Sequence, residues 1–132
     1  KTNREMLALY QSADIDLSGF SRAEGHNIPA HTATALGKWS IVSDCSAHKD
    51  WATAENSILV QPKGMIKAHD GFFFHHGGPF NSGNMYDFDM EDFDKAMVKA
   101  EGLAKTPNLN GLRLAKNTYS KMVDTMFEKI GD

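Results

Sequence analysis

The chain has 132 residues, of which 41% are hydrophobic and 23% are charged, and its formal net charge is −3. This composition is typical of a globular protein with one core, so we expect a single domain over residues 1–132. The chain has no excess of positive charge that would hold a polyanion. Nucleic acid is therefore excluded as an expected partner, and so is binding driven by an anionic membrane surface.

The cysteine count and the apolar runs set two further limits. Cys45 is the only cysteine, so an internal disulfide scaffold is excluded. The longest apolar runs, such as 57–60 and 72–74, are far shorter than the roughly 20 residues that a helix needs to cross a bilayer, and we expect no membrane span. The chain begins at Lys1 and not at Met, which indicates a processed protein or a fragment of a longer one.

The first third of the chain predicts one helix followed by irregular structure. Thr2-Asn3-Arg4-Glu5 has the form of a capping box, and apolar residues follow it at helical spacing. We therefore predict a helix near 3–13. The segment 14–37 carries glycine, asparagine and proline among scattered apolar residues, so we expect irregular structure there with one short helical turn at 33–36.

The middle third predicts three or four antiparallel strands. Residues 38–43 alternate and contain β-branched and aromatic side chains. Residues 57–60 and 65–68 bracket the turn Pro62-Lys63-Gly64 and are expected to form a β-hairpin. A further strand is expected at 72–75. The loop 77–83 could offer backbone amides to an anion, but it lacks the Gly-Lys-Ser/Thr ending of a phosphate loop.

The last third predicts two helices. Acidic residues load the first turns of a helix near 90–104, where the positive end of the helix dipole favours them. Thr106-Pro107-Asn108 ends that helix, and apolar residues from Leu112 to Ile130 repeat at helical spacing. The predicted fold class is thus α+β: an N-terminal helix, a small antiparallel β-sheet in the middle third, and a C-terminal helical hairpin packed on the sheet.

Thiol and imidazole side chains in the middle third form a candidate metal site. Cys45 and His48 have Cys-x2-His spacing, and His75 and His76 follow on the predicted strand. Thiolate and imidazole are zinc ligands, so zinc is the cofactor that these four residues would hold. Adjacent residues on a regular strand point to opposite faces, however, so only one of the two neighbouring histidines would join easily. Buried thiol and hydrogen-bonded histidines are the alternative interpretation.

The same residues also permit nucleophilic catalysis. Cys45 would attack the substrate, Asp44 or Asp70 would orient the base, and the base would be one of the histidines, His48, His69, His75 or His76. This hypothesis defines the alternative function, a Cys/His enzyme that is either metal-dependent or a cysteine-nucleophile hydrolase.

Two weaker patterns lie in the first third. Asp14, Asp16, Ser18 and Gly19 match positions 1, 3, 5 and 6 of a calcium loop, but Gly25 stands where the ligating glutamate belongs, so calcium is not expected. His26 and His31 lie five residues apart and could coordinate a metal or sense pH, since histidine titrates near neutrality. Solvated loop histidines are the alternative for this pair.

Aromatic residues suggest an interaction surface. Three consecutive phenylalanines on a strand cannot all face one side, so a second face of the sheet needs a cover. We predict that Phe72, Phe74 and Phe80 contact a partner protein or a second copy of the chain. The function predicted first is therefore a binding or assembly module, a subunit of a larger complex, which acts through an aromatic sheet face and the loop rich in glycine and asparagine.

Overall fold

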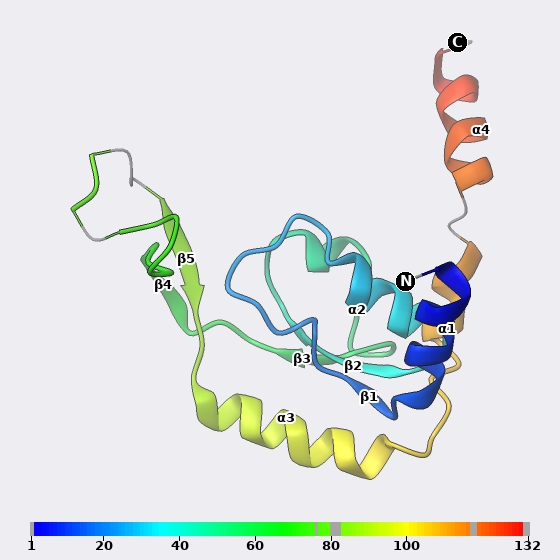
Figure 1. The fold of residues 1–132 in the computed structure, drawn as a ribbon, viewed down its shortest axis with the longest axis horizontal. Helices are drawn as coiled ribbons and strands as arrows, with labels where there is room; N and C mark the ends of the chain where they lie inside the picture. The colour runs from blue at the N-terminus through cyan, green and yellow to red at the C-terminus, as the bar shows by residue number, and fades with distance from the viewer. Residues whose placement is uncertain (1, 76, 80–82, 117–118, 131–132) are drawn as a thin grey trace.

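A computed structural model describes residues 2–75, 77–79, 83–116 and 119–130. Figure 1 shows the order of its helices and strands. They are α1 (Asn3–Ser12), β1 (Ile15–Asp16), α2 (Ile28–Ala35), β2 (Trp39–Ser43), the 3-10 helix η1 (Ser46–Asp50), β3 (Ile58–Val60), β4 (Gly64–Lys67), β5 (Asn84–Asp87), α3 (Met90–Leu103), the 3-10 helix η2 (Gly111–Lys116) and α4 (Tyr119–Ile130). The α+β class is confirmed.

The main sheet has three strands in the order β1-β2-β3, and all of them are parallel. The connection from β1 to β2 contains α2, and η1 lies between β2 and β3. Successive side chains of a strand point to opposite faces. Ile41 accordingly packs with Ala96 and Ala100 of α3, while Val42 packs with Ala30 of α2. The two helices therefore cover opposite faces of the sheet.

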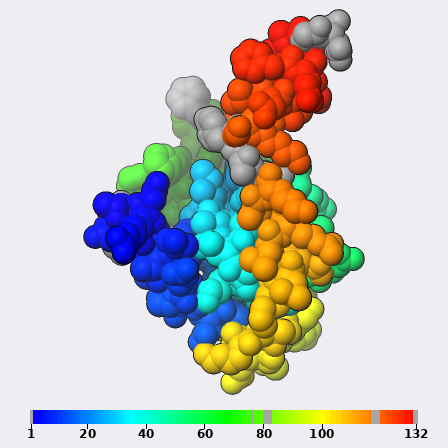
Figure 2. Space-filling model, turned by 90° about the vertical axis from the view of Figure 1, so that its right-hand side faces the viewer, coloured from blue at the N-terminus to red at the C-terminus, as the bar shows by residue number. Residues whose placement is uncertain are grey.

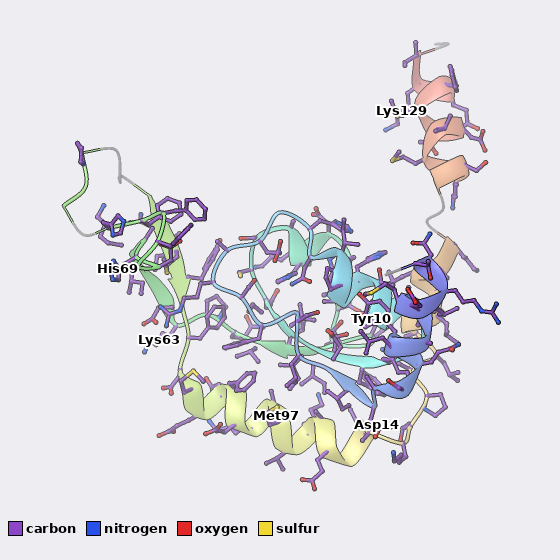
Figure 3. All side chains as sticks on the ribbon, viewed as in Figure 1. Tyr10, Asp14, Lys63, His69, Met97 and Lys129 are labelled. Atoms are coloured by element: carbon purple, nitrogen blue, oxygen red, sulfur yellow. The ribbon has the colours of Figure 1, made fainter. Side chains whose placement is uncertain are left out.

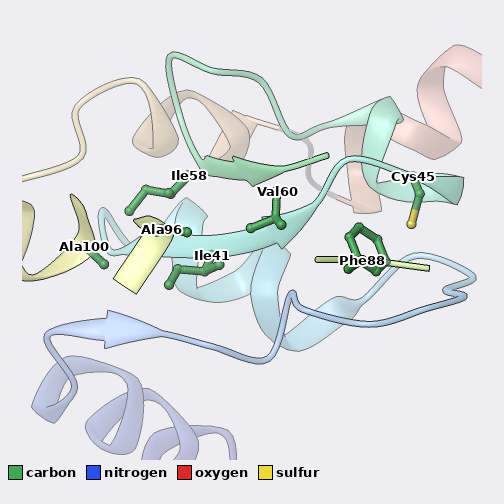
Figure 4. Close-up of a cluster of buried hydrophobic side chains, with 7 residues drawn as sticks. All are labelled: Ile41, Cys45, Ile58, Val60, Phe88, Ala96 and Ala100. Atoms are coloured by element: carbon green, nitrogen blue, oxygen red, sulfur yellow. The ribbon is translucent and has the colours of Figure 1, made fainter. Parts of the chain in front are cut away.

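The larger core cluster lies between the sheet and α3 (Figure 4). Its strand residues are Ile41, Ile58 and Val60, and α3 contributes Ala96 and Ala100. Small alanine side chains allow the helix to lie close to the β-branched residues of the sheet. On the other face, Ser40 and Thr34 of α2 join their hydroxyl groups at 2.8 Å, so the buried polar atoms there are paired.

The predicted hairpin between residues 57–60 and 65–68 is wrong. Leu59 pairs with Val42 in parallel, and Met65 pairs instead with Tyr86 in an antiparallel ribbon of β4 and β5. Strands that are buried on both faces are typical of parallel sheets, and Ile41 and Val42 are both fully buried. Antiparallel pairing is thus present in this region, but only in the separate two-stranded ribbon.

The predicted strand at 72–75 is also wrong, because these residues are irregular. The carboxylate oxygen Oδ1 of Asp70 accepts hydrogen bonds from the N–H groups of Phe72, Phe73 and Phe74, each at 2.8 Å. A strand would use these N–H groups in a ladder. The carboxylate therefore folds the segment into a tight turn.

Helices α1, α2 and α3 match the helices predicted from the sequence to different degrees. The capping box of α1 is present, with Thr2 and Glu5 bonded reciprocally. The predicted helix at 90–104 is α3, which Asp89 caps. The helical turn expected at 33–36 is part of a longer helix, α2, which begins at Ile28.

The C-terminal helices do not form a hairpin on the sheet. Helix α3 packs on β2 and β3, whereas η2 lies against α2 on the other side. Figure 2 shows α4 extending from the rest of the molecule, and none of its described side chains is buried. The apolar stripe predicted over 112–130 is therefore divided between η2 and α4, and only α3 covers the sheet as expected.

Candidate functional site

An open pocket of about 430 Å³ lies where β1 leads into α2. Its lining residues all belong to the loop after β1 and to the first turn of α2, and they are Ser18, Glu24, His26, Asn27, Ile28 and Pro29. The carboxyl ends of parallel strands meet at one edge of a sheet, so the pocket lies at that edge. Ligands of open parallel sheets bind at this edge, and the volume is in the range of small-molecule sites.

The side chain of Asn27 shapes the pocket. Its backbone is left-handed, with φ 60° and ψ 67°, and the residue is buried. Its amide nitrogen donates to the carbonyl oxygen of Ser18 at 2.7 Å, and its side-chain oxygen accepts from the N–H of Ala30 at 3.1 Å. One residue thus caps α2 and holds the loop after β1 against it.

The loop after β1 is also fixed to β2. The N–H of Ser43 donates to the carbonyl oxygen of Gly19 at 3.0 Å, and the N–H of Ser21 donates to the hydroxyl of Ser43 at 2.9 Å. A Cβ on Gly19 would lie 2.6 Å from the carbonyl oxygen of Ile41, so this close approach requires glycine. The wall of the pocket therefore rests on the carboxyl end of β2.

The polar groups at the pocket include one free backbone donor and one carboxylate. Pro29 has no N–H, and Asn27 uses the N–H of Ala30. The N–H of Ile28 has no acceptor in the part of the chain that the structure describes, and it lies at the positive end of the α2 dipole. Glu24 bonds the N–H of Gly25 through Oε1 at 3.0 Å, which leaves Oε2 for another donor.

Two aromatic side chains, Trp51 and His31, lie against His26, which lines the pocket. The indole N–H of Trp51 donates to the carbonyl oxygen of His26 at 3.0 Å. The ring of His31 lies 5.0 Å from the ring of His26 and 5.3 Å from that of Trp51, measured between centroids. Burial, together with the nearby His26, lowers the pKa of His31 from its ordinary value of 6.5. His31 therefore favours its neutral form.

The predicted residues Cys45 and His48 lie in the protein interior. Both side chains are fully buried, and the Sγ of Cys45 lies 4.0 Å from the carbonyl oxygen of Ser21. Burial raises the pKa of the Cys45 thiol, which disfavours the thiolate that attacks substrates or binds metals. The Nδ1 of His48 lies 2.9 Å from the carbonyl oxygen of Ser43, and Nε2 has no polar partner among the described residues.

The remaining predicted metal ligands lie elsewhere or cannot be placed. His75 is exposed in the segment between β4 and β5, and His76 lies outside the residues that the structure describes. Within the described ranges, no group of three or more His, Cys, Asp or Glu side chains could hold a metal ion. In the calcium-like string, Asp14 bonds Lys105 at 2.8 Å and Asp16 accepts from Ser18 at 2.8 Å. The zinc site stays a prediction without support from this structure.

Two of the predicted aromatic contact residues, Phe72 and Phe74, are exposed in the segment that follows β4, close in sequence to His69, which Figure 3 labels beside the β4–β5 ribbon. Phe72 is 75% exposed, Phe73 78% and Phe74 44%. The rings of Phe72 and Phe73 meet edge to face with centroids 4.6 Å apart. Phe80 lies outside the described residues. The aromatic face therefore belongs to a turn and not to a strand.

The chain matches no protein-family model, and no curated protein resembles it significantly in sequence. Among the helices in the described ranges, none combines the length and apolar character needed to span a bilayer.

Sequence reasoning missed the pocket. Asn27 followed by proline two residues later is typical of a helix start, with asparagine as the cap and proline in the first turn. That pattern was sufficient to predict α2. The pairing of β1 with β2, which makes this edge a carboxyl edge, leaves no comparable pattern because β1 has only two residues.

Proposed function

We propose that the chain is a binding module for a small molecule that carries phosphate and hydroxyl groups, as nucleotides do. The observation that carries this proposal is the pocket at the carboxyl edge of the parallel sheet, at the start of α2. In open parallel sheets nucleotides bind outside the carboxyl ends of the strands, at a reversal of strand order, with phosphate near a helix N-terminus. The order β1-β2-β3 shares this carboxyl edge but has no such reversal. The argument from topology is an analogy, so the side chains of the pocket must support it separately.

The part of the pocket at the N-terminus of α2 favours the binding of phosphate. The free N–H of Ile28 and the dipole of α2 both favour a negative group. His26 also lines the pocket, and an imidazole N–H can donate to a phosphate oxygen. The site would hold a single phosphate oxygen directly by the backbone, so we expect affinity in the micromolar range and not tighter.

The carboxylate of Glu24 can accept hydrogen bonds from the hydroxyl groups of a ligand. A carboxylate repels phosphate but accepts hydrogen bonds from the hydroxyls of a ribose or another sugar. Glu24 lines the same pocket as His26 and the start of α2. A ligand with both groups would thus satisfy both parts of the pocket, whereas phosphate alone would meet only one.

Calorimetric titration tests the proposal. The probes are the diphosphates of adenosine, guanosine and uridine, with inorganic phosphate and ribose as partial ligands. At least one nucleotide should bind saturably and more tightly than either partial ligand. Glu24→Gln should weaken its binding about tenfold, because one hydrogen bond to a charged group is lost. The exposed Glu101→Gln on α3 is the matched control. Absence of saturable nucleotide binding, or equal affinity for both variants, contradicts the proposal.

A second proposed function is assembly with a protein partner, or with a second copy, through the aromatic turn. The exposure of three consecutive phenylalanines favours it, since contiguous exposed apolar side chains mark contact surfaces. Sedimentation velocity on the chain should show concentration-dependent association that the double variant Phe72→Ser and Phe74→Ser abolishes. Phe127→Ser on α4, at a residue 71% exposed, is the control for a general loss of apolar surface. A strictly monomeric chain without dye-binding apolar surface contradicts assembly.

A further inference from the structure

We infer that the outer edge of β4 pairs with β4 of a second copy of the chain, antiparallel and about a twofold axis, so that the two ribbons join into one four-stranded sheet. This inference rests on the assembly function proposed above and deepens it, because it names the partner and the strand that the partner meets. The aromatic turn at 72–74 follows β4 by a few residues, so its exposed rings are within reach of the same contact.

The backbone of β4 has one neighbouring strand and one open side. Within the described residues the ribbon contains only β4 and β5, and in Figure 1 it lies to one side of the three-stranded sheet. The outer side of β5 is occupied at Tyr86, whose N–H donates to the carbonyl oxygen of Arg22 at 3.0 Å. In the same part of the chain no strand lies along the outer side of β4. The edge that can accept a further strand is therefore that of β4.

The bond of Tyr86 to the loop also shows which groups of β4 point outward. Met65 stands opposite Tyr86 in the ribbon. In an antiparallel pair of strands, opposite residues either exchange both backbone hydrogen bonds or direct these groups away from each other. Because the N–H of Tyr86 points away from β4, Met65 directs its N–H and C=O to the open edge, and so does Lys67 two residues later. The N–H of Ala68 donates to the carbonyl oxygen of Gly83 at 3.1 Å, as this alternation requires.

The side chains of β4 include apolar groups that lie in solvent. All four residues of the strand are exposed, among them Met65 at 58% and Ile66 at 40%. Ile66 stands opposite the buried Met85, so these two side chains share one face of the ribbon. A two-stranded ribbon is at most marginally stable alone, and further strands supply the packing that it lacks. Pairing with a second copy extends the row of Ile66 and Met85 across a wider sheet.

The register of the pairing follows from the outward groups and from the lysines. Because Met65 and Lys67 point outward, each can stand opposite itself or opposite the other residue in the second copy. Met65 opposite itself would set Lys63 against Lys67, and Lys67 opposite itself would set two lysines together. Like charges directly opposite are unfavourable. The remaining register pairs Met65 with Lys67 of the second copy and sets Ile66 opposite Ile66.

This register makes the strand complementary to its own copy. A twofold contact uses the same surface on both chains, and such dimers are the commonest oligomers. The contact is small, because four strand residues and one turn bury less than the roughly 1,200 Å² of a standard interface. We therefore expect a weak dimer, with a dissociation constant on the order of 100 μM.

Disulfide cross-linking tests the register. The background variant is Cys45→Ala, which leaves one thiol in each cysteine variant. Ile66→Cys should form an intermolecular disulfide with oxidised glutathione at least about tenfold faster than Met65→Cys or Lys67→Cys. The two Ile66 positions have Cα atoms about 4.5 Å apart in this register, whereas each control position is offset from its own copy by two residues, beyond the limit of about 7 Å. Equal rates for the three variants would overturn the pairing.

Sedimentation velocity tests the edge without a new thiol. Met65→Pro removes an outward N–H and none of the bonds between β4 and β5, and proline is tolerated at such edge positions. It should raise the dissociation constant of the dimer about thirtyfold, because the symmetric contact loses two hydrogen bonds. Met65→Ala keeps the N–H and is the matched control, for which we expect a smaller change. Equal urea midpoints of the two variants show that the fold is kept.

Failure of this inference and failure of the assembly function give different results. If Phe72→Ser with Phe74→Ser abolishes association while Met65→Pro associates as the wild type does, the aromatic turn assembles the protein and the inference about β4 fails. A strictly monomeric chain also overturns the inference. If that chain binds no apolar dye either, the assembly function fails with it.

Discussion

The side-chain amide of Asn27 donates to the carbonyl oxygen of Ser18 at 2.7 Å across nine residues of chain. The same side chain accepts the N–H of Ala30, so the loop after β1 and the first turn of α2 share one polar support. Loss of this support affects both the stability of α2 and the shape of the proposed site.

Asn27→Ala should lower the free energy of unfolding by about 2 kcal/mol, since a helix cap and a partly buried hydrogen bond are lost. Asn27→Gly should cost less, because glycine adopts the positive φ of 60° without strain. Urea unfolding measures both, with the exposed Asn3→Ala of α1 as control. Equal stability of Asn27→Ala and wild type would show that the two bonds contribute nothing.

Asn108 is a fully buried polar side chain that precedes η2 and makes three hydrogen bonds. Its amide nitrogen donates to the carbonyl oxygens of Lys38 and Asn56 at 3.0 and 2.7 Å, and its oxygen accepts from Gly111 at 2.8 Å. Asn108→Ala should therefore destabilise the protein by about 3 kcal/mol, because it leaves buried backbone groups unpaired. Asn110→Ala, which loses one bond of 3.3 Å to Glu55, should cost less than about 1 kcal/mol. Thermal and urea unfolding compare the two variants.

The thiol of Cys45 should react slowly in the folded protein. It is fully buried, and burial raises its pKa, so alkylation requires local opening. With iodoacetamide at pH 8 we expect the native rate to be about a hundredfold or more below the rate in urea. Mass spectrometry of the alkylated chain gives both rates. A native rate close to the unfolded rate would indicate an accessible thiolate and would restore the Cys/His enzyme hypothesis.

Helices α1 and α3 could be predicted from the sequence because the residues that determine them are close together in the chain. The reciprocal bonds of Thr2 and Glu5 depend on residues three apart, and the Asp89 cap of α3 precedes its apolar stripe directly. The parallel pairing of Ile41 with Ile58 depends on an intervening crossover and on burial of both sheet faces. Neither is visible in a run of three or four apolar residues, so the sequence predicted a hairpin.

The candidate sites show the same division between local and non-local causes. The aromatic run at 72–75 is compatible with a strand, but one carboxylate at Asp70 accepts hydrogen bonds from three of its N–H groups. The interval between Cys45 and His48 is compatible with metal binding, but tertiary burial removes both side chains from solvent. The pocket at Asn27 arises where the loop after β1, which is bonded to the end of β2, meets the start of α2, and only the helix start could be read from the sequence.

Substitution of exposed and of buried phenylalanines should change the free energy of unfolding by very different amounts. Phe72→Ser and Phe73→Ser should change the free energy of unfolding by less than about 0.5 kcal/mol, because both rings are already in solvent. Phe88→Ala should cost about 4 kcal/mol, since this ring is buried in the core beside Phe20, with centroids 5.2 Å apart. Urea unfolding measures all three. A large loss of stability in Phe72→Ser would mean that the aromatic turn stabilises the fold and would weaken the assembly proposal.

Stability should fall in mild acid because of His31. Its pKa in the folded protein is lowered by burial and by His26, so below the ordinary value of 6.5 the unfolded chain binds a proton that the folded protein resists. The slope of stability with pH follows the difference in bound protons, so the contribution of His31 is fully present above that value and is lost as the pH falls through it.

His31→Gln isolates this contribution, because glutamine keeps a polar side chain and does not titrate. The urea midpoint of the wild type should fall between pH 7.5 and pH 5.5 by more than that of His31→Gln. Because the two proteins differ only at this position, the difference between their profiles is due to His31. Parallel profiles for wild type and His31→Gln would contradict the burial of His31 beside His26 and Trp51.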